Sequence, residues 1–169
     1  MKVLVTWSSK TGNTKSVGEA IGRVCPPGTK ICPIEEAPAE GGDFDFLAIG
    51  YWVDKGVPDK KCRDYLKSIT GKKIAFFGTL GAYPDSDHAK ECMRKAEDLA
   101  LENEVCGHFI CQGRVDPKLL EMMAKMPNNP HPMTEERKAR IEEAKKHPNE
   151  EDFKNAQQCF QEIFSKIEQ

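Results

Sequence analysis

Several kinds of sequence feature are absent or scarce in this chain of 169 residues. No apolar run approaches the roughly 20 residues that a membrane-spanning helix needs, and the N-terminus has no apolar core of a signal peptide. Neither sign of charge is in excess, because 25 Lys and Arg stand against 27 Asp and Glu, which gives a formal net charge of −2. The sequence therefore predicts a protein with neither a membrane nor a nucleic acid as partner.

The cysteines form no disulfide or metal-binding pattern. There are 7 of them, an odd number, and no pair has the spacing C-x-x-C. Scattered thiols of this kind predict a reducing, cytoplasmic location. Cys106, His108 and Cys111 are close in sequence, but they fall within a predicted buried strand, so packing is the better interpretation than metal binding.

Short apolar runs alternate with helical patterns along most of the chain. We expect strands at residues 2–6, 30–34, 44–50, 72–78 and 105–111, and helices at 14–24, from 58 onward and at 87–103. This alternation predicts an α/β fold with a doubly wound parallel sheet and helices on both of its faces. Ligands of such sheets bind at the carboxyl ends of the strands. The loops that begin at Ser8, Gly50 and Gly78 are therefore expected to meet at one edge.

The pattern changes after the fifth predicted strand. A short helix is expected at 115–126, then a proline-rich break, then a polar helix that Thr134 caps and that ends near Lys146. The last helix carries a wide apolar stripe that fits one face of the sheet: Phe153, Ala156, Phe160, Ile163, Phe164 and Ile167. We therefore expect a single domain over 1–169, with an inserted helical segment at about 114–147.

The loop after the first strand is suited to an anion. It consists of Ser9, Lys10, Thr11, Gly12, Asn13 and Thr14, and a helix begins within it. Such a loop presents hydroxyls and backbone N–H groups, and the helix dipole adds to the attraction. The order Ser-x-Thr-Gly-Asn-Thr resembles the phosphate loop of flavodoxins, which implies that these residues bind the phosphate of FMN. A Ser/Thr-rich turn that only caps a helix is the alternative.

The loop after the third strand is rich in aromatic residues. It consists of Tyr51, Trp52, Val53, Asp54, Lys55 and Gly56. Large exposed aromatic side chains usually serve for contact. The resemblance to flavodoxins implies that this loop binds the cofactor, with Trp52 stacked on the isoalloxazine ring. The alternative is a tryptophan packed beneath the loop.

The loop after the fourth strand offers close approach to a flat ligand. It contains Thr79, Leu80, Gly81 and Tyr83, and its glycines allow the backbone to lie near a ring. The resemblance implies that these residues also bind FMN and that Tyr83 covers the second face of the ring. A tyrosine on a surface turn is the alternative.

The three loops and the order of elements together make the chain similar to short-chain flavodoxins. This resemblance implies a five-stranded sheet of order 2-1-3-4-5, FMN as cofactor, and a monomer that carries electrons between a reductase and an acceptor enzyme. The segment around His131-Pro132 and Thr134 further resembles a branch from anaerobic bacteria, some of whose members accompany bilirubin-reducing enzymes.

Two features depart from the flavodoxin pattern. Familiar flavodoxins are strongly acidic, whereas this chain is nearly neutral. Familiar flavodoxins also often have a Gly-Asp peptide that turns toward the flavin. This chain has Val53-Asp54 followed by Lys55-Gly56 at that place. Either the Lys55-Gly56 peptide makes this turn or the chain has no such turn. Two other functions remain open: an FMN-dependent oxidoreductase that acts on a quinone or tetrapyrrole, and a flavin-free interaction module. No catalytic residue and no metal ligand is predicted.

Overall fold

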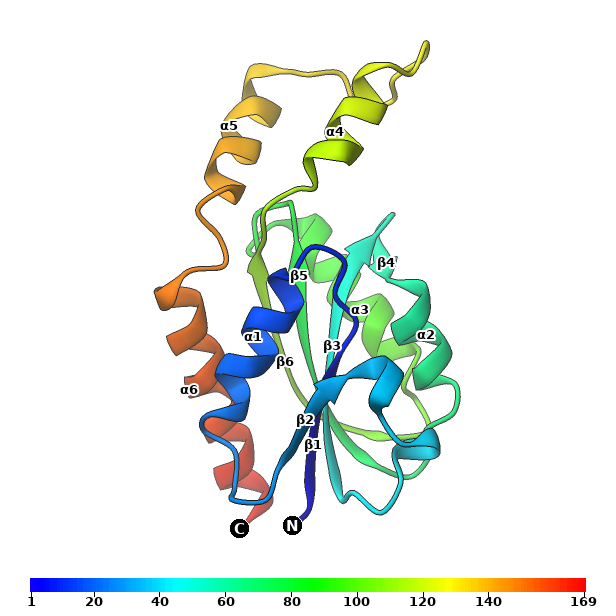
Figure 1. Ribbon diagram of the computed structural model, residues 1–169, viewed down its shortest axis with the longest axis vertical. Coiled ribbons are helices and arrows are strands. Elements are labelled where there is room, and N and C mark those ends of the chain that lie inside the picture. The colour runs from blue at the N-terminus through cyan, green and yellow to red at the C-terminus, as the bar shows by residue number, and fades with distance from the viewer.

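A parallel sheet organises the chain, as the computed structural model of residues 1–169 shows (Figure 1). Its strands are β1 (Val3–Trp7), β2 (Lys30–Pro33), β3 (Phe46–Asp54), β5 (Lys73–Leu80) and β6 (Glu104–Gln112). Their order is β2-β1-β3-β5-β6 and all neighbours are parallel. This order confirms the predicted fold class and strand order. The additional strand β4 (Val57–Pro58) does not change it, because β4 pairs only with the end of β3, in the antiparallel sense.

Helices cover both faces of the sheet. The helices α1 (Asn13–Gly22) and α6 (Glu150–Ile167) lie on one face, and α2 (Lys60–Leu66) and α3 (Asp87–Asp98) lie on the other (Figure 1). Two short 3-10 turns, Ile34–Glu36 and Ala39–Gly41, connect β2 to β3. All five residues of β1 are buried, which explains why the first apolar run has no polar alternation.

Each face of the sheet has its own apolar core. The predicted stripe of α6 packs on α1 and β6 and also reaches β3, where the ring centroids of Phe46 and Phe164 are 5.2 Å apart. The second core lies between the sheet and α2 and α3. The helix expected at 87–103 is shorter than predicted, because α3 ends at Asp98 and Leu99 just beyond it is 36% exposed.

The aromatic segment after Gly50 forms a β-hairpin, which the sequence did not predict. β3 continues to Asp54, turns at Lys55 and Gly56, and returns as β4. Both turn residues have positive φ, 51° for Lys55 and 81° for Gly56, which suits a two-residue hairpin turn. The second helix consequently begins after Pro58, and the side chain of Asp59 caps it.

The inserted segment, 114–147, projects beyond the carboxyl ends of the strands as a helical arm (Figure 1). The arm consists of α4 (Pro117–Ala124), α5 (Glu135–Ala144) and the chain around them. None of the residues of α4 is buried. The ends of the arm meet where the backbone N–H of Arg114 donates to the carbonyl of His147 at 3.0 Å. Every helix of the chain is too short or too polar to span a membrane.

Candidate functional site

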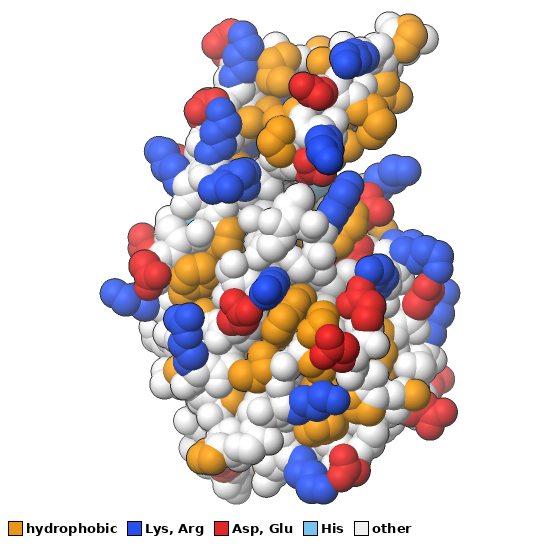
Figure 2. Space-filling view, viewed as in Figure 1, with side chains coloured by type: hydrophobic (Ala, Val, Ile, Leu, Met, Phe, Trp, Pro, Cys, Tyr) orange, Lys and Arg blue, Asp and Glu red, His pale blue; other side chains and the backbone are white.

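A cleft opens at the carboxyl edge of the sheet, below the helical arm. The loop after β1, the end of β3, the end of β5 and the start of the arm line it. Its residues are Ser9, Lys10, Thr11, Asn13, Thr14, Trp52, Val53, Thr79, Leu80, Gly81, Gly113, Arg114, Val115, Asp116 and Leu119. In Figure 2 the surface narrows between the arm and the body, and Lys and Arg side chains are frequent around this region. The three loops therefore lie together at one edge of the sheet, as predicted.

The loop after β1 leaves several backbone N–H groups without a hydrogen-bond partner at the start of α1. Gly12 has φ of 95°, a left-handed conformation that glycine adopts without strain. The hydroxyl of Ser9 accepts the N–H of Gly12 at 3.2 Å and that of Lys15 at 3.3 Å. The N–H groups of Thr11, Asn13 and Thr14 have no hydrogen-bond partner. These three donors and the positive end of the helix dipole form a site for an anion.

The threonines of the cleft have different environments. Thr14 and Thr79 are buried, and their hydroxyl oxygens are 2.9 Å apart, so this pair ties the start of α1 to the end of β5. The Thr11 side chain is exposed at the cleft and makes no hydrogen bond. Of these hydroxyls, that of Thr11 is the one free to donate to a ligand.

Trp52 lies in the cleft, where a buried carboxylate fixes its backbone. The backbone N–H of Trp52 donates to Asp59 Oδ1 at 3.3 Å, and the backbone N–H of Cys62 donates to Asp59 Oδ2 at 3.3 Å. Burial raises the pKa of the Asp59 carboxyl, and its hydrogen bonds oppose that shift. The ammonium of Lys10 lies 5.5 Å from the centroid of the Trp52 ring, a cation–π geometry. The indole is therefore an aromatic surface beside the anion site, and its stacking on a cofactor ring stays a prediction.

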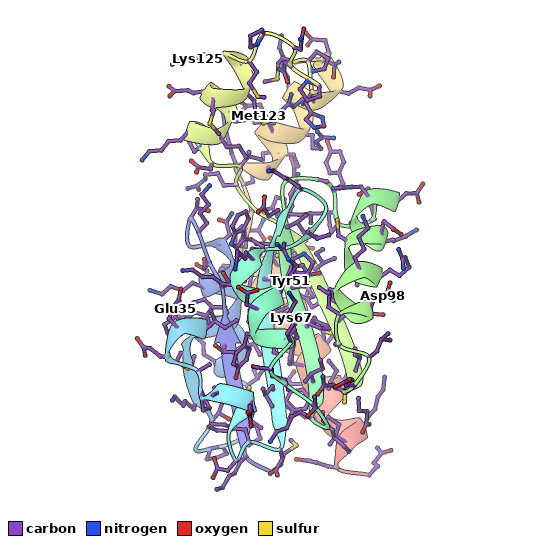
Figure 3. The ribbon with its side chains drawn as sticks, turned by 90° about the vertical axis from the view of Figure 1, so that its right-hand side faces the viewer. Glu35, Tyr51, Lys67, Asp98, Met123 and Lys125 are labelled. Carbon is purple, nitrogen blue, oxygen red and sulfur yellow. The ribbon has the colours of Figure 1, made fainter.

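Tyr51, a predicted cofactor contact, has its side chain in the core instead (Figure 3). Successive residues of a strand point to opposite faces, so Trp52 faces the cleft and Tyr51 faces α3. The Tyr51 hydroxyl is 2.7 Å from Nε2 of His108, whose Nδ1 is 2.9 Å from Oε1 of Glu97. Burial lowers the pKa of His108, and the contact with Glu97 opposes this. The polar atoms of this core tyrosine and histidine are thus satisfied within the fold.

Five other predicted cofactor contacts are not among the residues that line the cleft. Gly12 lies within the loop after β1 itself. Asp54, Lys55 and Gly56 are at the end of β3 and in the turn of the β3–β4 hairpin, and Tyr83 is 40% exposed and borders a different hollow. A turning Lys55-Gly56 peptide beside the cofactor and a cover of the ring by Tyr83 stay predictions.

The start of the arm is a wall of the cleft that residue-by-residue reasoning missed. The residues concerned are Gly113, Arg114, Val115, Asp116 and Leu119. The Asn13 side chain donates to the carbonyl of Arg114 at 2.9 Å, and Asp116 lies 3.8 Å from the ammonium of Lys10. The signal was present, because this segment follows β6 at the same edge where the other loops gather.

The arrangement suits a ligand with an anionic end and a flat aromatic body. The free N–H groups of the loop after β1 face the anion, Trp52 offers a ring, and Leu80, Val115 and Leu119 add apolar surface. Most of the other lining residues are polar, and Lys10, Arg114 and Asp116 are charged. The cleft therefore combines donors for an anionic group with one aromatic and a few apolar side chains.

The chain is similar over nearly its whole length to proteins of one family. The family model described as "Flavodoxin domain" matches residues 4–161. The flavodoxin-like domain-containing protein BilS of Clostridioides difficile (strain CD3) is 36% identical over an alignment of 164 residues, and the match covers 92% of each chain. The protein of the same description from Clostridium symbiosum is 29% identical over an alignment of 148 residues, and that match covers 75% of each chain.

Solved structures share the fold at low sequence identity. Flavodoxin 1 of Bacillus cereus has a TM-score of 0.61 and 18% identity, and the match covers 98% of both chains. A flavoprotein of Lactobacillus acidophilus in complex with FMN has a TM-score of 0.52 and 16% identity, over 73% of this chain and 99% of the other. The strand order and the two helical layers are thus an architecture that these proteins have in common.

Proposed function

Because this chain belongs to the flavodoxin domain family, we propose that it binds FMN in the cleft and carries electrons between a reductase and an acceptor enzyme. The observation that carries this proposal is the loop after β1, where the N–H groups of Thr11, Asn13 and Thr14 are free. A phosphate there gains several charge-assisted hydrogen bonds without rearrangement of the loop.

Each side of the cleft has a part in holding FMN. The loop after β1 fixes the phosphate, and Trp52 lies where an aromatic ring can stack. The buried Asp59 keeps the Trp52 backbone in place, and the Thr14–Thr79 pair keeps α1 at the edge of the sheet. FMN supplies the redox chemistry when it is bound, and the protein supplies binding, orientation and electrostatics.

A second function is supported by the arm. Its first residues form one wall of the cleft, so the arm can cover a small substrate held beside the flavin. The protein would then be an FMN-dependent oxidoreductase with a quinone or tetrapyrrole as substrate. Catalytic turnover of NAD(P)H with a soluble quinone distinguishes the functions, since a carrier alone supports almost none.

The test of the leading proposal begins with reconstitution. We expect the purified chain to bind FMN with quenched flavin fluorescence, and to bind riboflavin more weakly because riboflavin has no phosphate. The loaded protein is then reduced by NADPH and a flavodoxin reductase, and reoxidised by cytochrome c in stopped flow. A chain that stays colourless with excess FMN would refute the proposal. A loaded protein that exchanges no electrons with either protein would refute the carrier role.

A further inference from the structure

A second hollow adjoins the cleft beside the β3–β4 hairpin. It shares Val53, Leu80 and Gly81 with the cleft, and its other lining residues are Lys55, Gly56, His88, Lys95 and His131. These come from the hairpin tip, from α3 and from the outer loop of the arm. The shared residues make the two spaces continuous, so a molecule in this hollow lies next to the occupant of the cleft.

Every ionisable side chain that lines this hollow is basic. None of Lys55, His88, Lys95 and His131 forms a salt bridge. Elsewhere the chain pairs many of its cations, and even the nearby Lys60 and Lys61 bind Asp64 and Glu35. The ammonium groups of Lys55 and Lys95 carry like charges, and an anion between them reduces their repulsion.

Nearby carboxylates form no salt bridge with the basic groups of the hollow. Asp54 and Asp87 are close in sequence to its residues but do not line it. Both carboxylate oxygens of Glu91 accept hydrogen bonds from Arg94, at 2.6 and 3.0 Å, while the charge of Lys95 also helps to lower the Glu91 pKa. The ammonium of Lys95 thus has a carboxylate within reach of its charge but no direct partner.

The two residues of the hairpin turn contribute differently to the hollow: Lys55 adds a charge, and Gly56 leaves space. Lys55 has φ of 51°, where asparagine, aspartate or glycine is usual in a two-residue turn. A strained conformation of this kind points to a use for the side chain that occupies it. Gly56 leaves room: a Cβ there would lie 3.8 Å from His88 Cε1 and 3.9 Å from Lys95 Nζ. Both basic groups thus converge on one point at the tip.

We propose that this hollow binds a carboxylate of the molecule that exchanges electrons at the cleft. The carboxylate lies among Lys55, Lys95 and the two imidazoles, and the apolar part of the molecule contacts Val53 and Leu80. The inference rests on the proposed electron-transfer function and adds to it the charge of the electron partner. The carboxylate belongs either to a free organic acid or to an acidic side chain of a partner protein, since the recognition chemistry is the same.

The four histidines of the chain provide the readout. His88 and His131 line the hollow, where Nε2 of His88 is 3.7 Å from the sulfur of Cys92, whereas His108 and His147 lie elsewhere and are hydrogen-bonded there. We expect phenylpropionate, added to the FMN-loaded protein, to shift the imidazole NMR signals of His88 and His131 and to leave those of His108 and His147 unmoved. The neutral analogue phenylpropanol should produce no such pattern.

Variants test the roles of the two lysines. In Lys55→Asn/Lys95→Gln we expect phenylpropionate to bind about fivefold more weakly, as for the loss of two exposed ionic contacts. Lys55→Asn keeps the turn because asparagine tolerates positive φ, so its melting temperature should equal or exceed that of the parent. The matched control Lys154→Gln/Lys166→Gln removes the same charge from α6 and should leave the affinity unchanged.

A short peptide that alternates glutamate and phenylalanine distinguishes the two sources of the carboxylate. Tighter binding of the peptide than of phenylpropionate indicates a partner protein, and the reverse indicates a free acid. The proposal is overturned if neither probe shifts His88 and His131, or if the lysine variant binds both probes as the parent does. The same titration is repeated without FMN. If the protein does not bind FMN, the proposed function fails, but the shifts of His88 and His131 can still be measured, so the two proposals can fail separately.

Discussion

Among single residues, Thr11 has the free hydroxyl of the loop after β1, whereas the Thr14 hydroxyl is 2.9 Å from that of Thr79. Thr11→Ala should therefore weaken FMN binding by on the order of 1–3 kcal/mol and leave riboflavin binding nearly unchanged. Thr14→Ala should in addition lower the melting temperature, because it removes a buried contact. Calorimetry with both ligands measures the effects, and the exposed Thr70→Ala is the control. Equal losses for FMN and riboflavin would show that Thr11 does not bind the phosphate.

Trp52 is the residue whose side chain decides how the ring is bound. Trp52→Ala should cost about 1–2 kcal/mol of FMN affinity and restore part of the flavin fluorescence, as expected for loss of an aromatic contact. Trp7 is the control tryptophan, because it is 5% exposed in the core, and Trp7→Phe should affect stability more than affinity. If Trp52→Ala changes neither the fluorescence nor the dissociation constant, the indole does not touch the ring.

Between elements, the helical arm is attached to the body by few contacts. α4 has no buried residue, and in α5 only Ala144 is buried. The two helices of the arm meet through a contact of 3.9 Å between the guanidinium of Arg137 and the sulfur of Met123. Met123 is labelled in Figure 3. The arm therefore adds little to the core, although its first residues line the cleft.

Replacement of residues 117–143 by a short glycine–serine linker tests the role of the arm. The linker can close the gap because Arg114 and His147 are already hydrogen-bonded at 3.0 Å. We expect a folded protein by circular dichroism that keeps most of its FMN affinity but transfers electrons to its acceptor more slowly. Met122→Ser, at an exposed position of α4, is the control for a local change. An unfolded product would show that the arm is structural.

At the scale of the whole molecule, His147 connects the arm to the body. Its Nδ1 is 2.6 Å from Asp152 of α6, and its Nε2 is 3.2 Å from Glu143 of α5. Burial alone lowers the pKa of His147, but the hydrogen bonds and charges of Asp152 and Glu143 outweigh it, so the pKa is raised. A protonated imidazole in this position bridges two carboxylates.

The raised pKa makes this bridge dependent on pH. Its contribution to stability is complete below the unfolded pKa near 6.5 and is lost as pH rises through the higher folded pKa. His147→Gln should therefore cost about 0.5–1 kcal/mol in the free energy of unfolding at pH near 5.5, and less above neutral pH. Urea unfolding across this range measures it, with the exposed His131→Gln as control. A constant difference at every pH would mean that the charge of His147 does not stabilise the fold.

Much of the fold and part of the site follow from local patterns in the chain. A buried parallel strand needs an unbroken apolar run such as Val3–Trp7, and a helix on a sheet needs an apolar stripe such as that of α6. The anion loop was predictable because its N–H groups depend on a glycine and a helix start that are neighbours in sequence. Such features are set by residues a few positions apart, whose conformational preferences act whatever the rest of the chain does.

The remaining features depend on residues that meet only in the folded chain. Strand register turned Tyr51 into the core to meet His108, and hairpin pairing carried Lys55 out of the cleft toward Lys95 and His88. The hydrogen bond from the Asn13 side chain to the carbonyl of Arg114 likewise joins the start of the arm to the loop after β1. Local patterns could not decide these placements, because a side chain's direction at the end of a strand is set by burial and hydrogen bonding with distant segments, whose free energies exceed local preferences.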